Sequence, residues 1–136
     1  MILVTGATGL VGGHLMWHLL QSHYKVVAIL RKTSNIDALK SIFRFYGSDV
    51  DALLQKIEWR EADILDLDSL AMAFHDIDIV YHCAAVVSLS SGTETMTDTN
   101  VSGTKNIVEL ALQNKISKLC YVSSIAALGD LKASEM

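Results

Sequence analysis

Residues 2–13 read Ile-Leu-Val-Thr-Gly-Ala-Thr-Gly-Leu-Val-Gly-Gly, and no other stretch says more about the fold. An apolar strand runs directly into three spaced glycines, and a helical pattern follows from His14. Gly6 permits a tight turn, Gly9 lets the backbone approach a pyrophosphate, and Gly12 lets the helix pack close to the sheet. The helix N-terminus then offers N–H groups and a partial positive charge to the phosphate. The stretch therefore predicts a turn that binds a dinucleotide through Gly6, Thr8, Gly9, Leu10, Val11 and Gly12.

Composition indicates one globular domain. The chain has 136 residues, of which 51% are hydrophobic and 19% charged, so it can bury a sizeable core. A net charge of −4 gives no reason to expect nucleic acid or an anionic membrane surface as a partner. No apolar run reaches the roughly 18 residues that a membrane span needs. Cys83 and Cys120 lack the spacing of a metal or redox motif, so we expect reduced thiols in a cytoplasmic protein.

Apolar runs rich in β-branched residues alternate with helical patterns along the chain. Strands are predicted over residues 2–5, 25–30, 57–61, 78–82 and 118–123. Helices are predicted over residues 11–22, 36–46, 67–75 and 99–114. Several strands are apolar on both faces, as a parallel sheet covered by helices requires. We expect an α/β fold, a Rossmann-type doubly wound parallel sheet of strand order 3-2-1-4-5, forming one domain over residues 1–136.

The helix over residues 99–114 has the clearest pattern. Asp98 or Thr99 can cap its start, and Asn114 can close it in a left-handed conformation. Its predicted apolar face consists of Val101, Ile107, Val108, Leu110, Ala111 and Leu112.

A basic pair follows the second predicted strand. Arg31 lies 19 positions after Gly12, and Lys32 comes next. A site for NAD would place an acidic residue here to bind the ribose 2′-hydroxyl, whereas a guanidinium can hold a 2′-phosphate bidentately. With hydroxyls at Thr33 and Ser34, the pair favours NADP over NAD. The alternative is a solvated basic turn.

Candidate residues also follow the third strand. Asp63 can accept a hydrogen bond from the adenine amino group, and Ile64 can pack on the ring. The alternative is an acidic turn in which Asp66 or Asp68 caps the next helix.

Small residues follow the fourth strand. Cys83, Ala84 and Ala85 would let the backbone run beneath the nicotinamide ribose, and His82 before them is interpreted as a packed histidine rather than a base.

The remaining polar candidates are a serine pair and a histidine pair. Ser123 and Ser124 end the fifth strand and could bind a substrate carbonyl or alcohol, although paired serines are equally typical of turns. His14 and His18 share a helical face, but no third ligand lies at a suitable spacing, so no metal site is predicted.

Together these motifs resemble the extended short-chain dehydrogenase/reductases, the NAD-dependent epimerase/dehydratase group. The resemblance covers essentially the whole chain, and two segments, Tyr81–Ser88 and Ser123–Gly129, are most similar to dihydroflavonol 4-reductase-like enzymes. The motifs in their family order are Thr5–Gly12, Ala62–Ile64, His82–Ala85, Asn100–Thr104 and Tyr121–Ser124.

The resemblance implies an oxidoreductase that binds NADP(H) or NAD(H) and acts on a small-molecule carbonyl or alcohol. Ser124 matches the catalytic serine that positions the substrate oxygen, and Ser123 would line the cofactor. Asn100 matches a helix asparagine that supports the active site through a backbone distortion and an ordered water. Two alternatives remain open: a nucleotide-sugar epimerase or dehydratase, and a non-catalytic nucleotide-sensing or interaction module.

The chain departs from the family pattern at the acid/base, a tyrosine with lysine four residues on, some tens of residues beyond the serine. None of the four tyrosines has that lysine: Tyr24, Tyr46, Tyr81 and Tyr121. Proton transfer needs a positioned group of suitable pKa. We therefore expect a chain truncated after strand five, without the substrate region, that binds cofactor but shows no turnover. An apolar sheet edge at Leu119 and Tyr121 would favour self-association into a homo-oligomer and lower stability.

Overall fold

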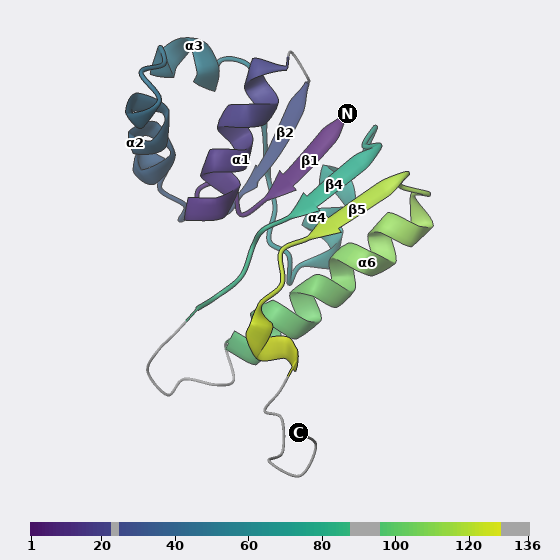
Figure 1. Ribbon diagram of the computed structural model, residues 1–136. Coiled ribbons are helices and arrows are strands. Elements are labelled where there is room, and N and C mark those ends of the chain that lie inside the picture. The colour runs from purple at the N-terminus through teal and green to yellow at the C-terminus, as the bar shows by residue number, and fades with distance from the viewer. Residues whose placement is uncertain (23–24, 88–95, 129–136) are drawn as a thin grey trace.

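The computed structural model describes residues 1–22, 25–87 and 96–128, and within them five strands form one sheet (Figure 1). The strands are β1 (Ile2–Thr5), β2 (Val26–Leu30), β3 (Ile57–Glu61), β4 (Ile79–His82) and β5 (Lys118–Tyr121). They pair in the order β3-β2-β1-β4-β5, and every pair is parallel. The predicted doubly wound sheet and its strand order are confirmed.

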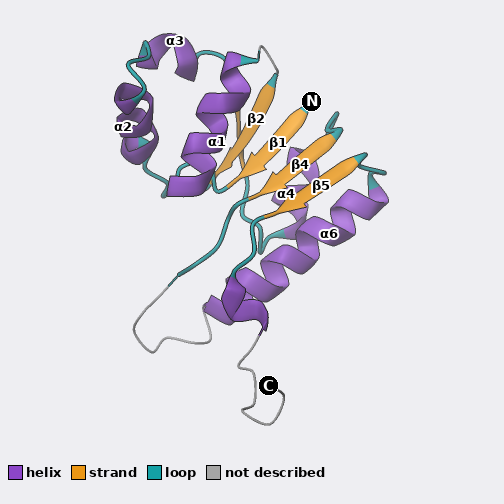
Figure 2. Cartoon of the chain, viewed as in Figure 1, coloured by secondary structure: helices purple, strands orange, loops and turns teal. Residues whose placement is uncertain are grey.

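Helices connect the strands and cover both faces of the sheet (Figure 2). The α-helices of the described residues are α1 (Leu10–Gln21), α2 (Asp37–Phe45), α3 (Val50–Leu54), α4 (Leu67–Ala73) and α6 (Thr104–Gln113). A π-helical segment, η1 (Asp98–Gly103), leads directly into α6, and a 3-10 turn, η2 (Ile125–Leu128), follows β5. Across the same residues, every helix is too short or too polar to cross a bilayer.

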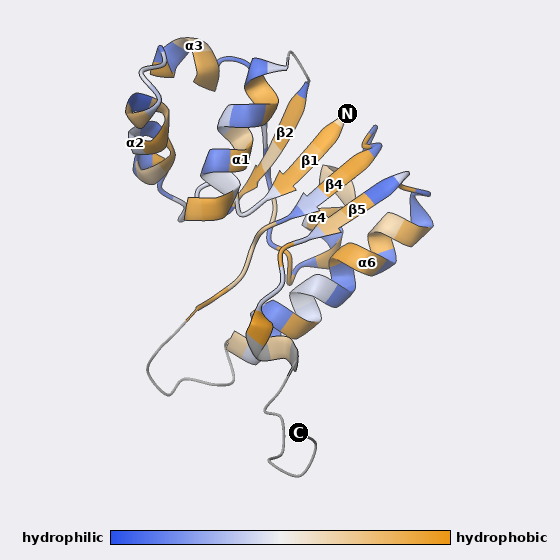
Figure 3. Ribbon diagram, in the orientation of Figure 1, coloured by the Kyte–Doolittle hydropathy of each residue, from blue (hydrophilic) through white to orange (hydrophobic). Residues whose placement is uncertain are grey.

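The core has two parts, one on each side of the sheet. Ile2 and Val4 of β1 pack with α1 and α2, whereas Leu3 between them packs with α4 and α6. This alternation follows from the two-residue period of a strand, and both parts are apolar because helices cover both faces. Accordingly, β1 and β2 are hydrophobic along their length, while α6 carries both kinds of residue (Figure 3).

Three details of the helices differ from the sequence prediction. Helix α3 was not predicted; Asp49 caps it by accepting from the N–H groups of Asp51 and Ala52. The N-terminal caps proposed for the last helix, Asp98 and Thr99, are wrong, because η1 already begins at Asp98 and no side chain caps it. Asn114 is the C-cap of α6, as predicted, and its side-chain amide donates to the Leu110 carbonyl, but the left-handed residue is Lys115, with φ of 53°.

The predicted apolar face of the last helix is half right. Ile107, Leu110 and Ala111 are buried against the sheet. The other three members are exposed, because steps of seven and four residues set them on a second stripe of the helix: Val101, Val108 and Leu112. Edge strand β5 also leaves Leu119 and Tyr121 exposed, by 36% and 50%.

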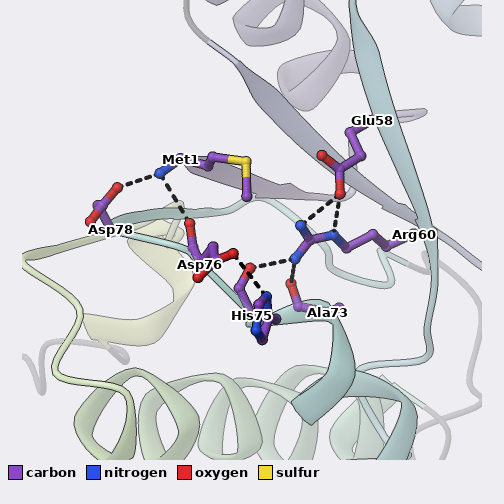
Figure 4. A network of polar contacts seen from close by, with 7 residues as sticks. All are labelled: Met1, Glu58, Arg60, Ala73, His75, Asp76 and Asp78. Carbon is purple, nitrogen blue, oxygen red and sulfur yellow. Dashed lines mark hydrogen bonds and ion pairs between the residues drawn. The ribbon is translucent and has the colours of Figure 1, made fainter.

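An arginine of β3 binds the segment where α4 ends (Figure 4). Arg60 donates from Nη1 to the carbonyls of Ala73 and His75, at 2.8 and 2.7 Å, where α4 ends. Its Nε and Nη2 donate to Glu58 Oε1 at 2.8 and 2.6 Å. The Met1 amino group pairs nearby with the Asp78 carboxylate. Arg60 thereby satisfies the carbonyl of Ala73 in the last turn of α4 and that of His75 just beyond it.

Candidate functional site

The glycine turn lies where β1 ends and α1 begins. Gly6 has a φ of 69°, and a Cβ there would lie 2.6 Å from the Ala84 nitrogen. A Cβ at Gly12 would lie 2.2 Å from the Gly6 carbonyl oxygen. Both clashes are with backbone, so the fold itself requires glycine at these two positions.

Gly9 differs from the other two glycines. Its φ of −85° and ψ of 174° are open to any residue, and a Cβ would meet only the Gly6 oxygen, at 3.3 Å. Gly9 is the N-cap of α1, and no side chain caps this helix. Leu10 and Val11 in the first turn are exposed. Packing within the chain therefore requires glycine far less here than at positions 6 and 12, because a shift of a few tenths of an ångström would accommodate a Cβ.

One cleft at the carboxyl ends of the strands gathers residues from five parts of the chain. Of the residues predicted for the site, the cleft is lined by Gly6, Thr8, Gly9, Arg31, Asp63, Ile64, Cys83, Ala84 and Ala85. The other predicted residues lie outside this lining: Leu10, Val11, Gly12, Lys32, Asn100, Ser123 and Ser124. Several residues that line the cleft were not predicted as site residues, among them Thr5, Leu30, Val86 and Thr99. The position of Leu30, directly before Arg31 at the end of a strand, could have indicated it.

Charged residues line a region next to the cleft, where β2 and β3 end. Lys32 Nζ lies 3.5 Å from Glu61 Oε1, and both side chains are exposed. Arg31 borders both this region and the main cleft. Ser34 Oγ accepts the Arg31 backbone N–H at 3.0 Å. Within the described residues no carboxylate forms an ion pair with Arg31, so its guanidinium can serve an anion.

Asp63 and Ile64 are positioned by local contacts. Asp63 Oδ1 accepts the Leu65 N–H at 3.0 Å, and the carboxylate borders the cleft. Ile64 is buried in the core below η1, where a Cβ at Gly103 would meet its side chain. Asp66, rather than Asp68, caps α4. Asp63 is thus part of an acidic turn and also lines the cleft.

His82 is a buried histidine between two hydroxyls. Its Nδ1 lies 2.7 Å from Thr5 Oγ1, and its Nε2 lies 3.0 Å from Thr104 Oγ1. The side chain is 1% exposed, and this burial lowers the pKa of His82 to about 4. The geometry agrees with a packed residue, because a neutral ring held on both sides has no access to a reacting group.

Asn100 lies in η1, so the backbone distortion implied by the family resemblance is present as a π-helix. Its Nδ2 donates to the Val86 carbonyl at 2.9 Å, and its Oδ1 accepts the Val86 N–H at 2.8 Å. Asn100 thus holds the backbone that forms one wall of the cleft. Ser123 and Ser124 follow β5 and are exposed. Gly129, which ends the segment Ser123–Gly129 that resembles the family, lies outside the described residues.

The two cysteines are free thiols, and His14 contacts a tyrosine. Cys83 and Cys120 are free and half-buried; burial, and then the neighbouring Cys120, raises the pKa of Cys83. His14 Nδ1 lies 2.9 Å from the Tyr46 hydroxyl. Throughout residues 1–22, 25–87 and 96–128, no group of three or more potential ligands is placed to hold a metal ion.

Comparisons with known proteins identify relatives of this chain. The model of the NAD dependent epimerase/dehydratase family matches residues 2–136. The chain is 35% identical over 127 residues to the "Putative dihydroflavonol 4-reductase" of Synechocystis, covering 93% of this chain and 33% of that protein. The chain therefore spans about a third of the length of that curated relative.

Two solved structures have the same fold. A thiolation-reductase di-domain from an archaeal non-ribosomal peptide synthetase superposes with a TM-score of 0.80 at 27% identity, covering 98% of this chain and 38% of that one. A UDP-glucose-4-epimerase from Stenotrophomonas, solved with bound NAD, gives a TM-score of 0.74 at 26% identity, covering 99% and 40%. The likeness thus extends to both reductases and epimerases.

Proposed function

The chain belongs to the NAD-dependent epimerase/dehydratase family, and we propose that it is the dinucleotide-binding part of an NADP(H)-dependent oxidoreductase acting on a carbonyl or alcohol. The observation that carries the proposal is the contrast among the glycines. Packing requires glycine at positions 6 and 12, whereas the crowding at Gly9 is slight. A bare backbone at the uncapped start of α1 suits a pyrophosphate, which takes N–H donors and the helix dipole.

The other site residues are assigned along the cleft. Arg31 and Lys32 bind the 2′-phosphate, Asp63 and Ile64 the adenine, and the small residues after β4 the nicotinamide ribose. In this assignment the cofactor site consists of Gly6, Thr8, Gly9, Leu10, Val11, Gly12, Arg31, Lys32, Asp63, Ile64, Cys83, Ala84, Ala85, Asn100 and Ser123. Ser124 positions the substrate oxygen.

Preference for NADP over NAD rests on Arg31. The epimerase structure was solved with NAD, so the preference is a property proposed for this chain alone. The Arg31 guanidinium lies beside the cleft, has no carboxylate partner among the described residues, and can form a bidentate pair with a phosphate, whereas Lys32 would add a single ammonium that Glu61 also attracts.

Titration of the purified chain with NADPH and NADH tests the preference. We expect NADPH to bind more tightly, and Arg31→Gln to weaken NADPH by roughly tenfold to a hundredfold, the range for charge-assisted hydrogen bonds. NADH affinity should hardly change. The matched control Lys32→Gln should have a smaller effect on NADPH. Equal affinities for the two cofactors in the wild type would contradict the proposal.

The 136 residues should bind cofactor without turning it over. No tyrosine in them is followed by lysine at the fourth position, so the family's proton donor is missing from the sequence at hand. We expect no NADPH oxidation above background with aldehyde or ketone substrates. Reductase activity from this polypeptide would contradict the expectation.

The epimerase is the second candidate, because the fold matches a UDP-glucose-4-epimerase as well as a reductase domain. It differs in substrate, a nucleotide sugar in place of a simpler carbonyl compound. A non-catalytic nucleotide-sensing module is the third candidate, supported by the missing proton donor. The substrate region lies outside this chain in the proposed assignment, so turnover of a nucleotide sugar against a simple ketone by the whole protein separates the second candidate from the first.

Composition supports a small-molecule substrate rather than nucleic acid or membrane, and the free thiols of Cys83 and Cys120 support a cytoplasmic location. The exposed edge at β5 supports self-association, which sedimentation velocity would measure; a strict monomer would argue against it.

A further inference from the structure

A chain of hydrogen bonds runs through the protein from the glycine turn to η1, and His82 is its central member. The Ala84 N–H donates to Thr5 Oγ1 at 3.1 Å, and Thr5 Oγ1 lies 2.7 Å from His82 Nδ1. On the other side of the ring, Nε2 lies 3.0 Å from Thr104 Oγ1, which donates to the Asn100 carbonyl at 2.7 Å. Three separate parts of the sequence, around Thr5, His82 and Thr104, are thus connected through one buried ring.

The protons on this chain can be assigned by counting donors. A threonine hydroxyl carries one proton, and that of Thr104 is given to the Asn100 carbonyl. Thr104 must therefore accept from His82, which places a proton on Nε2. A neutral ring with its proton on Nε2 has a bare Nδ1, so Thr5 Oγ1 donates its proton to Nδ1 while it accepts from the Ala84 N–H. The neutral Nε2–H tautomer alone satisfies every member.

We propose that His82, held as the neutral Nε2–H tautomer, is a positioning residue that couples the glycine turn to Asn100 and so sets the wall of the cofactor cleft. The wall is the backbone from Ala84 to Val86. Its first residue is held by Thr5, and its last is held on both backbone groups by Asn100. His82 links Thr5 to Asn100 through Thr104. The role in cofactor binding rests on the proposed function, whereas the tautomer and the coupling do not.

Two substitutions separate the halves of the chain. In His82→Asn, the amide oxygen can take the place of Nδ1 and accept from Thr5, but nothing reaches Thr104. In His82→Gln, the amide nitrogen can take the place of Nε2 and donate to Thr104, but the bond to Thr5 is lost. A residue that served only to fill space would not distinguish the two variants.

NMR of the 15N-labelled protein without cofactor provides the first test. Long-range proton–nitrogen spectra of His82 at neutral pH should show a protonated Nε2 and a bare Nδ1. We expect His82→Asn to shift the Asn100 side-chain amide signals while the Ala84 N–H stays in place. His82→Gln should do the reverse. A proton on Nδ1, or equal shifts at both sites in both variants, would overturn the proposal.

Thr104→Val provides a test that leaves His82 unchanged, with Thr104→Ser as its control. We expect Thr104→Val to shift the Asn100 amide and weaken NADPH binding by about tenfold, the effect of one buried hydrogen bond. Thr104→Ser, which keeps the hydroxyl, should restore both. An unchanged Asn100 amide in Thr104→Val would overturn the coupling. If the wild type binds neither dinucleotide, the proposed function fails, but the tautomer and amide shifts still decide this proposal.

Discussion

Replacing Gly9 with alanine should separate ligand binding from folding. The backbone at Gly9 is in the extended region, which alanine adopts freely, and the nearest contact of the new Cβ is 3.3 Å away. Alanine is a poorer N-cap than glycine, by up to about 1 kcal/mol, but it lowers the entropy of the unfolded chain by a similar amount. The free energy of unfolding should therefore stay within about 1 kcal/mol of the wild type.

The effect of Gly9→Ala on NADPH affinity should be much larger than its effect on stability. A methyl group at this position occupies the space where a pyrophosphate would contact the backbone at the start of α1. Losing one charge-assisted hydrogen bond costs about 1.5–3 kcal/mol, which corresponds to roughly tenfold to a hundredfold in affinity. Isothermal titration with NADPH measures this change, and urea denaturation of the same samples measures stability.

Gly12→Ala is the matched control, because it adds the same methyl group one helical turn away. There the Cβ would lie 2.2 Å from the backbone oxygen of Gly6. Backbone cannot yield as a side chain does, so we expect a loss of about 3 kcal/mol or more in stability. The reasoning is refuted if Gly9→Ala destabilises the protein as much as Gly12→Ala, or if it binds NADPH as well as the wild type does.

Two further predictions concern stability alone. Arg60→Met should lower the free energy of unfolding by about 2 kcal/mol, because the carbonyls at the end of α4 lose a charged donor. The exposed Arg44→Met should change it by less than about 0.5 kcal/mol, and equal losses in urea denaturation would contradict the assignment. His82 has a pKa of about 4 in the fold and 6.5 when unfolded, so the unfolded state binds more protons between these values. Stability should fall by roughly 3 kcal/mol as the pH drops from above 6.5 to 4. His82→Asn should lack this part of the decline, and parallel pH profiles for the two proteins would refute it.

The sheet could be predicted because its signals are local. Apolar runs such as Val26–Leu30 and the spaced glycines each fix a conformation within a few residues. Strand order then follows from the handedness of the crossovers and the position of the glycine turn. The residues around Arg31 and Asp63 were found in the same way, since they directly follow strands whose carboxyl ends meet in one cleft.

Details of the helix ends could not be predicted to the residue. Helix α3 has five residues, too few for a periodic pattern, although Asp49 is an ordinary capping residue. Asn114 and Lys115 are neighbours, and the asparagine side chain bonds back to the helix, which leaves the left-handed position to the lysine. Such choices depend on small energy differences between adjacent residues.

The contacts around His82 could not be predicted from the sequence, because they depend on strand register. Thr5 and His82 are 77 residues apart and are direct partners in the pairing of β1 with β4. Because side chains alternate between the faces of a strand, a shift of one residue in this register would turn the His82 ring to the opposite face. The bond to Thr5 would then be lost, and Ala84 would no longer lie against Gly6. Apolar packing on both faces fixes the register, and Leu3 lies beside Val80. The core of the sheet therefore determines where the chain of hydrogen bonds through His82 can form.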